Sequence, residues 1–160
     1  MRKNIHGVVL GLILFGAFVL RVNQLNTIPV GMTDDEVRAV YSAYSLWNTG
    51  RDLTRGILLP VSFVLHNFSF TPVSIYATAP FVGILGLSPF SARLPFALAG
   101  VGVVFLTYLV VQRLLKNQTV AVIAAGVLAV NVWAIQLSRI AYESGFALLF
   151  SVSHRRLSAG

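Results

Sequence analysis

Three acidic residues stand in a row at Asp34, Asp35 and Glu36, in a chain with only five acidic residues in total. Thr33 precedes them, and a threonine followed by glutamate three residues later has the spacing of a capping box at the start of a helix. One carboxylate completes such a cap. Because consecutive helical residues point about 100° apart, the three carboxylates cannot all serve it. At least one is therefore available for other chemistry, either accepting a proton from a hydroxyl group or binding a divalent cation.

The residues after this acidic cluster predict a helix over residues 33–49. Asn48 and Gly50 supply the stop signal for that helix. Its larger apolar residues fall at helical spacing along one stripe: Val37, Val40, Tyr41, Tyr44 and Trp47. Aromatic residues are enriched at the depth of the lipid headgroups, so we expect an amphipathic helix that lies on the outer membrane surface.

The composition identifies the class of protein. Hydrophobic residues make up 56% of the chain and charged residues 11%, whereas a soluble domain carries about 25% charged residues. The chain is therefore predicted to be an integral membrane protein. Its net charge of +7 comes from basic residues scattered singly at the ends of apolar runs, where Lys and Arg reach for lipid headgroups and set topology. That distribution excludes nucleic-acid binding.

The apolar runs predict an all-α polytopic transmembrane bundle. We expect four spans and the start of a fifth, within one partial transmembrane domain that covers residues 1–160. The spans are predicted at about 5–22, 71–87, 94–111 and 119–137, with the interrupted fifth run at 144–152. Nine residues are too few to cross a bilayer as a helix, so the sequence reads as a fragment of a longer protein.

The distribution of basic residues predicts the orientation. The N-terminus carries Arg2 and Lys3, whereas the outer loop at 23–70 has a slight negative balance. The bias of Lys and Arg toward the cytoplasm therefore predicts a multi-pass cell-membrane protein with a cytoplasmic N-terminus and an extracytoplasmic first loop. Alternating the spans then puts Arg139 and Glu143 inside, on the side of the membrane away from Asp35.

An ordered series of residues along most of the chain resembles a known enzyme family. The matching positions are Pro29, Gly31, Asp35 and Glu36, then Tyr41, Tyr44, Ser45 and Leu46, then Thr49 to Asp52, Gly56, Leu59 and Pro60, then Pro72, Tyr76, the run from Phe81 to Pro95, Gly100, Gln136, Ser138, Arg139 and Glu143. This series is similar to the N-terminal portion of the protein O-mannosyltransferases and aminoarabinose transferases, which are glycosyltransferases of the GT-C fold. It matches about the first third of such an enzyme.

The resemblance implies transfer of a sugar, with inversion, from a polyprenyl-phosphate carrier to an acceptor hydroxyl. In that family the loop aspartate is the proposed base, and it corresponds to Asp35; Glu36 would assist it. The leaving lipid phosphate needs positive charge from a basic residue or a divalent cation. The residues assigned to substrate binding are Arg51, Arg93 and Tyr41. For Arg93, which precedes the third span, a topology anchor is the alternative. No metal ligand, donor sugar or acceptor is assigned.

The sequence departs from the family in one place. The stretch from His66 to Pro72 has neither the acidic residues nor the Lys that family members often carry there. We keep a second hypothesis, a non-catalytic small membrane protein that retains the helical scaffold. Little or no activity is expected from this chain alone, because half of a membrane bundle cannot enclose a donor. A transporter or channel is less favoured, because no charged residue lies inside the four apolar runs.

Overall fold

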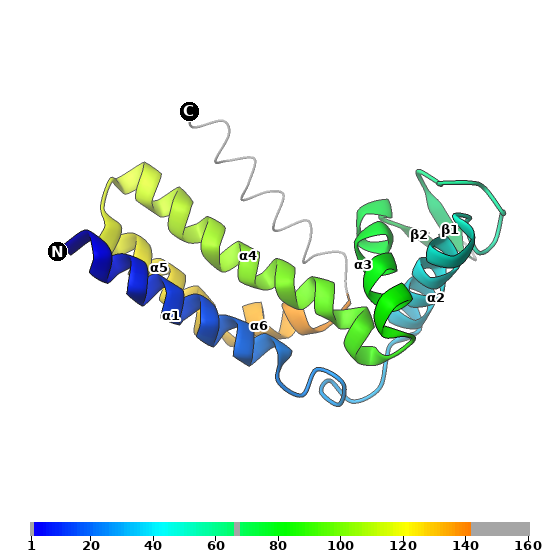
Figure 1. Cartoon of the computed structure of the whole chain (residues 1–160), viewed down its shortest axis with the longest axis horizontal. Coiled ribbons are helices and arrows are strands. Elements are labelled where there is room, and N and C mark those ends of the chain that lie inside the picture. Colours follow the sequence, from blue (N-terminus) through cyan, green and yellow to red (C-terminus); the bar gives the residue numbers. More distant parts are fainter. Residues whose placement is uncertain (1, 66–67, 142–160) are drawn as a thin grey trace. The chain divides into compact units, whose positions relative to one another are not determined.

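The computed structural model describes residues 2–65 and 68–141. Within them the chain is mainly helical, as predicted, with one short two-stranded ribbon that the sequence did not indicate (Figure 1). The elements are α1 (Arg2–Val22), α2 (Asp34–Thr49), β1 (Phe63–Leu65), β2 (Phe68–Phe70), α3 (Pro72–Leu85), α4 (Pro89–Leu115), α5 (Gln118–Val130) and α6 (Val132–Arg139). The two strands pair antiparallel.

The described residues form two compact units. The first unit contains α1, the part of α4 that follows Phe96, α5, and α6 up to Ser138. The second unit contains Gln24–Phe96 and the segment that begins at Arg139. It therefore holds the acidic cluster, α2, the ribbon, α3 and the first turns of α4.

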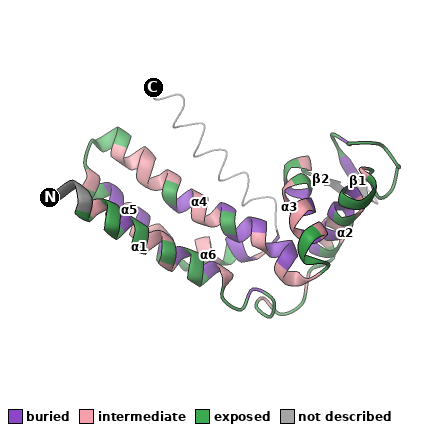
Figure 2. Ribbon diagram, in the orientation of Figure 1, coloured by how far each residue is buried: buried purple, intermediate pink, exposed green. Residues whose placement is uncertain are grey.

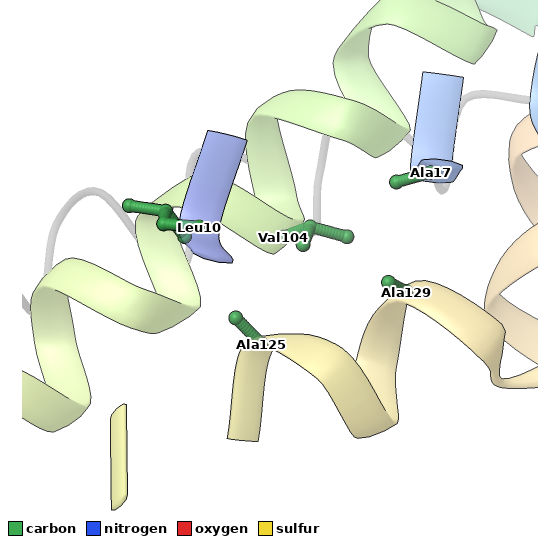
Figure 3. Packing of buried hydrophobic residues seen from close by; sticks show 5 residues of the cluster. All are labelled: Leu10, Ala17, Val104, Ala125 and Ala129. Carbon is green, nitrogen blue, oxygen red and sulfur yellow. The ribbon is translucent and has the colours of Figure 1, made fainter. Parts of the chain in front are cut away.

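The core of the first unit is built from small residues. Figure 3 shows Leu10 and Ala17 of α1, Val104 of α4, and Ala125 and Ala129 of α5 in one buried cluster. Alanines let helix backbones approach closely, which is how membrane helices pack. Parts of these helices are exposed (Figure 2). Leu12 and Phe15 are among the most exposed apolar side chains on α1. Apolar residues on both the inner and the outer face fit a lipid surrounding.

Within the described residues, two helices are long and apolar enough to cross a membrane. They are α1, over Ile5–Val22, and α4, which match the first and third predicted spans. The pair α5 and α6 passes the same test only as a single span bent by 59°. The structure therefore supports two spans, or three with the bent pair. It is consistent with a membrane protein, but four spans are not confirmed, and the predicted run at 144–152 lies outside the described residues.

Local residues explain the two differences. The second predicted span, 71–87, forms a helix of only 14 residues, shorter than the roughly 20 that a bilayer requires. This helix ends at Gly86, whose φ of 80° takes the chain out of the helix. The fourth predicted span breaks at Asn131. Its N–H donates to Leu128 O and its side chain accepts from Ala134 N, so Asn131 ends α5 and begins α6.

Arg21, at the end of α1, donates hydrogen bonds to the last turn of α5, next to this break. Its guanidinium donates to Ala17 O at 3.2 Å, Ala129 O at 3.1 Å and Leu128 O at 3.5 Å. The last two carbonyls belong to the final turn of α5, where helix carbonyls lack partners in their own helix. The side chain is 1% exposed. The expectation that basic residues at span ends reach for lipid headgroups is therefore wrong for Arg21.

The second unit is organised by the packing of α2 against α3. Ala43 and Leu46 of α2, Phe63 of β1, and Ile75 and Ala79 of α3 form its main core. Beside this core, the indole ring of Trp47 covers Gly83 so closely that a Cβ atom at position 83 would clash with it. A further set of buried residues, Val40, Val82 and Ala92, joins α2 and α3 to the beginning of α4. The N-terminal half of α2 is therefore packed against α3 and the beginning of α4.

Candidate functional site

The predicted capping box forms at the start of α2. Thr33 Oγ accepts a hydrogen bond from Glu36 N at 3.2 Å, and Glu36 Oε2 accepts one from Thr33 N at 3.0 Å. At the other end of the helix, Gly50 has a φ of 66° and its N–H donates to Leu46 O. The helix predicted over 33–49 is thus confirmed, together with both signals that define its ends.

Glu36 also takes part in a buried ion pair that local sequence patterns do not indicate. Arg93 Nε donates to Glu36 Oε1 at 3.0 Å, and Arg93 Nη2 donates to Glu36 Oε2 at 3.2 Å. The backbone N–H of Ala141 donates to Glu36 Oε1 at 2.9 Å. With the bond from Thr33 N, each carboxylate oxygen of Glu36 accepts two hydrogen bonds.

The remaining donors of Arg93 bind the loop that leads into α2. Nη1 donates to Pro29 O at 2.9 Å and to Leu25 O at 3.5 Å, and Nη2 donates to Gly31 O at 2.5 Å. A guanidinium has five N–H donors, so all of them are directed at Glu36 or at this loop. Arg93 is 1% exposed. In this arrangement it holds the loop and the first turn of α2 together and has no donor left for a lipid phosphate.

The ion pair also fixes the charge of Glu36. Burial by itself raises the pKa of this carboxyl group. The hydrogen bonds from Arg93, Ala141 N and Thr33 N, together with the positive charge of Arg93, outweigh burial and leave the pKa of Glu36 below its ordinary value. A carboxylate that is ionised, buried and fully hydrogen-bonded is a weak proton acceptor. The geometry therefore favours a positioning role for Glu36 over proton transfer.

The two aspartates of the cluster differ from Glu36. Asp34 is exposed and Asp35 is half-buried. Among the residues that the structure describes, neither carboxylate has a hydrogen bond or ion pair. Because Asp35 directly precedes Glu36, the bonds of Glu36 fix the backbone on which Asp35 stands. Asp35 thus combines a fixed backbone with a carboxylate that is not used by the fold.

The other predicted site residues lie farther along α2. Tyr41 is 51% exposed, on a face of α2 that it shares with Val37, Tyr44 and Trp47. Arg51 is exposed beyond the C-terminal cap, where its Nη1 donates to Gly56 O at 2.8 Å. Since a helix rises 1.5 Å per residue, Asp35 and Thr49 are about 21 Å apart along the axis of α2, and Arg51 lies beyond Thr49. The structure therefore joins Glu36 with Arg93 and leaves Arg51 remote from Asp35.

Two groups near the start of α2 were not predicted. Arg139 Nη2 donates to Ile28 O at 3.0 Å, and Ala141 N donates to Glu36, the neighbour of Asp35. The prediction that Arg139 lies on the opposite side of the membrane from Asp35 is therefore wrong, because it assumed that 119–137 was one uninterrupted span. In the sequence, the break between α5 and α6 was signalled only by Asn131, a polar residue inside an apolar run. Glu143, predicted beside Arg139, lies outside the described residues.

No family model, curated protein or solved structure matches this chain. The similarity to GT-C glycosyltransferases therefore stays a prediction. Within the described part of the chain, no three His, Asp or Glu side chains gather where they could hold a metal ion. The divalent cation likewise stays a prediction.

Proposed function

We propose that the chain contributes to a membrane glycosyltransferase that moves a sugar from a polyprenyl-phosphate donor to an acceptor hydroxyl with inversion. Asp35 acts as the base. Its carboxylate accepts the hydroxyl proton while the hydroxyl oxygen attacks the anomeric carbon, and the bond from that carbon to the phosphate oxygen breaks. The lipid phosphate leaves with the electron pair of that bond. This step requires one free carboxylate in a fixed position.

The observation that carries the proposal is the contrast between neighbouring carboxylates. Glu36 uses both oxygens to fasten the first turn of α2. Asp35, on the adjacent residue, is half-buried and has no partner among the described residues. Within this proposal Glu36 and Arg93 are positioning residues. Arg38 follows Asp35 by three residues on α2, so the two side chains are helical neighbours, and Arg38 is the candidate for contact with the lipid phosphate.

We also propose the location of the site. The protein resides in the cell membrane as a multi-pass protein, with its N-terminus in the cytoplasm and residues 23–70 on the outer side. The exposed face of α2 supports this placement, since Tyr41, Tyr44 and Trp47 are the residue types that collect at the membrane–water interface. A polyprenyl-phosphate carries its sugar at the same depth.

The test compares two neighbouring aspartates. Because little or no activity is expected from this chain alone, a full-length enzyme that carries this loop is reconstituted into lipid nanodiscs with radiolabelled polyprenyl-phosphate sugar, and release of the sugar from the lipid is measured. Asp35→Asn should lower the rate at least about 100-fold, the usual contribution of a general base. Asp34→Asn removes the same charge from the adjacent residue and should leave the rate nearly unchanged. Equal rates for the two variants would refute the assignment of Asp35.

A second candidate is a non-catalytic membrane protein that retains the scaffold. It is favoured by one observation: Glu36 and Arg93, both assigned to the site from the sequence, satisfy each other in the structure. This candidate predicts no sugar release when a full-length enzyme carries the wild-type loop, although that protein is folded. A cooperative unfolding transition measured on the same nanodisc sample would establish that it is folded.

A further inference from the structure

The loop between α2 and β1 presents apolar side chains to its surroundings. Figure 2 colours most of this loop as exposed. The exposed apolar residues are Leu53 (47%), Ile57 (46%), Leu58 (61%), Leu59 (63%) and Val61 (89%). Single exposed apolar residues are normal, but a contiguous group usually marks an interaction surface. We call these five residues the apolar loop.

The backbone beneath the apolar loop is bonded to itself around Asp52. This buried side chain accepts from Thr54 N at 2.9 Å through Oδ1 and from Arg55 N at 3.2 Å through Oδ2. Its own N–H donates to Ile57 O at 2.9 Å, and Gly56 N donates to Asp52 O at 3.3 Å. The side chain and the backbone of Asp52 together therefore make four hydrogen bonds within this turn.

The ends of the loop are held as well. Leu59 N donates to Gly50 O at 2.8 Å, next to the cap of α2. The buried Pro60 offers its carbonyl to Tyr76 Oη at 3.1 Å, which fastens the loop to α3. Several backbone groups of the loop are therefore hydrogen-bonded within the unit, while its leucines are exposed. These hydrogen bonds lower the cost of bringing the loop into an apolar phase, where unpaired backbone groups are unfavourable.

We propose that the apolar loop inserts into the interfacial layer of the bilayer that contains the chain's own spans. The unit that holds the loop is joined in sequence to two membrane-length apolar helices: Gln24 follows α1, and Phe96 lies within α4, which begins at Pro89. The loop therefore belongs to a chain that has helices of membrane-spanning length on both sides of it. The placement is independent of catalysis, so it holds for either candidate function.

The charges around the loop favour a lipid over a protein partner. Arg51 and Arg55 are exposed, whereas the one acidic residue of the loop, Asp52, is buried and hydrogen-bonded. The exposed charge is therefore positive beside an apolar tip. This combination suits a membrane surface, where phosphate headgroups lie above the acyl chains and attract Lys and Arg.

The chain has no cysteine, so a single introduced cysteine carries a fluorescent label at a known position. Leu58→Cys and, separately, Leu59→Cys are labelled with an environment-sensitive dye in the full chain, reconstituted into liposomes that contain spin-labelled lipids. Asp34→Cys, on the exposed first turn of α2, is the control. We expect blue-shifted emission at 58 and 59, and lipid quenching about twice that at 34 or more. Using two positions covers the case in which one variant does not fold.

The quenching should also grow with the fraction of anionic lipid, and Arg55→Gln should reduce that growth. Emission at 58 and 59 that is as water-like as emission at 34 would overturn the proposal. Blue-shifted emission without quenching by lipid would overturn it as well, because a second copy of the chain or another protein would then cover the loop. The emission and quenching at positions 58 and 59 are independent of whether Asp35→Asn loses or retains sugar release.

Discussion

Replacing Arg93 by methionine tests the buried ion pair directly. Methionine retains much of the side-chain length but removes every N–H donor, so Glu36 keeps only the bonds from Thr33 N and Ala141 N. The two side chains are 1% and 2% exposed, so water cannot replace the lost bonds. Breaking such a pair by removing one partner costs about 3–5 kcal/mol. We expect the free energy of unfolding to fall by about this amount.

The assay is unfolding by increasing SDS in mixed micelles, followed by the fluorescence of Trp47. A Trp133→Phe background removes the other tryptophan. Arg55→Met is the matched control, because Arg55 is exposed and surface changes stay within about 0.5 kcal/mol. Adding Glu36→Gln to Arg93→Met should recover part of the loss, because no buried charge is then left unpaired. If Arg93→Met costs no more than Arg55→Met, the reasoning about the buried pair is refuted.

Two further predictions concern the same unit. The pKa of Glu36 is lowered in the folded protein. The contribution of Glu36 to stability is therefore fully present above the ordinary pKa of 4.5 and is lost as the pH falls through the lower pKa of the folded state. The same pH titration of Glu36→Gln should lack this loss. Gly83→Ala places a Cβ against Trp47, so overpacking should lower the free energy of unfolding by about 1–3 kcal/mol and shift the Trp47 emission. Gly11→Ala is the control, because Gly11 has open space around it. It should be neutral or stabilising in the same unfolding assay. An unchanged Gly83→Ala variant would contradict the close packing of Trp47.

The features that the sequence predicted correctly are those with local signals. Thr33 and Glu36 are three residues apart, and Gly50 directly follows the last turn of α2, so cap and stop could be identified from neighbouring residues alone. The helices α1 and α4, which are long and apolar enough to span a membrane, were equally evident, because long apolar runs need no information from elsewhere in the chain. The sequence also predicted correctly that a carboxylate beyond the one in the cap is unused within the described residues, because three acidic residues stand in a row and the cap needs one.

The features that the sequence missed depend on distant residues or on single polar residues. Glu36 and Arg93 are separated by 57 positions, and Arg93 had only the general signal of a basic residue at a span end. Composition also cannot distinguish an apolar helix of 14 residues from a span. On α2, periodicity grouped Val40 with Tyr41 and Tyr44, but only Val40 is buried. Spacing identifies an apolar stripe without showing which part of it packs inside the protein.

The buried ion pair itself indicates what the first turn of α2 is for. A buried pair is often no more stabilising than apolar residues of similar volume, so stability alone does not account for Glu36 and Arg93. Apolar residues could fill the same space, but they could not bind Pro29 O, Gly31 O and Thr33 N in fixed directions. What the pair adds is a defined position for the backbone that carries Asp35. That precision has a use if the carboxylate of Asp35 must meet a substrate atom, and the comparison of Asp35→Asn with Asp34→Asn tests this role.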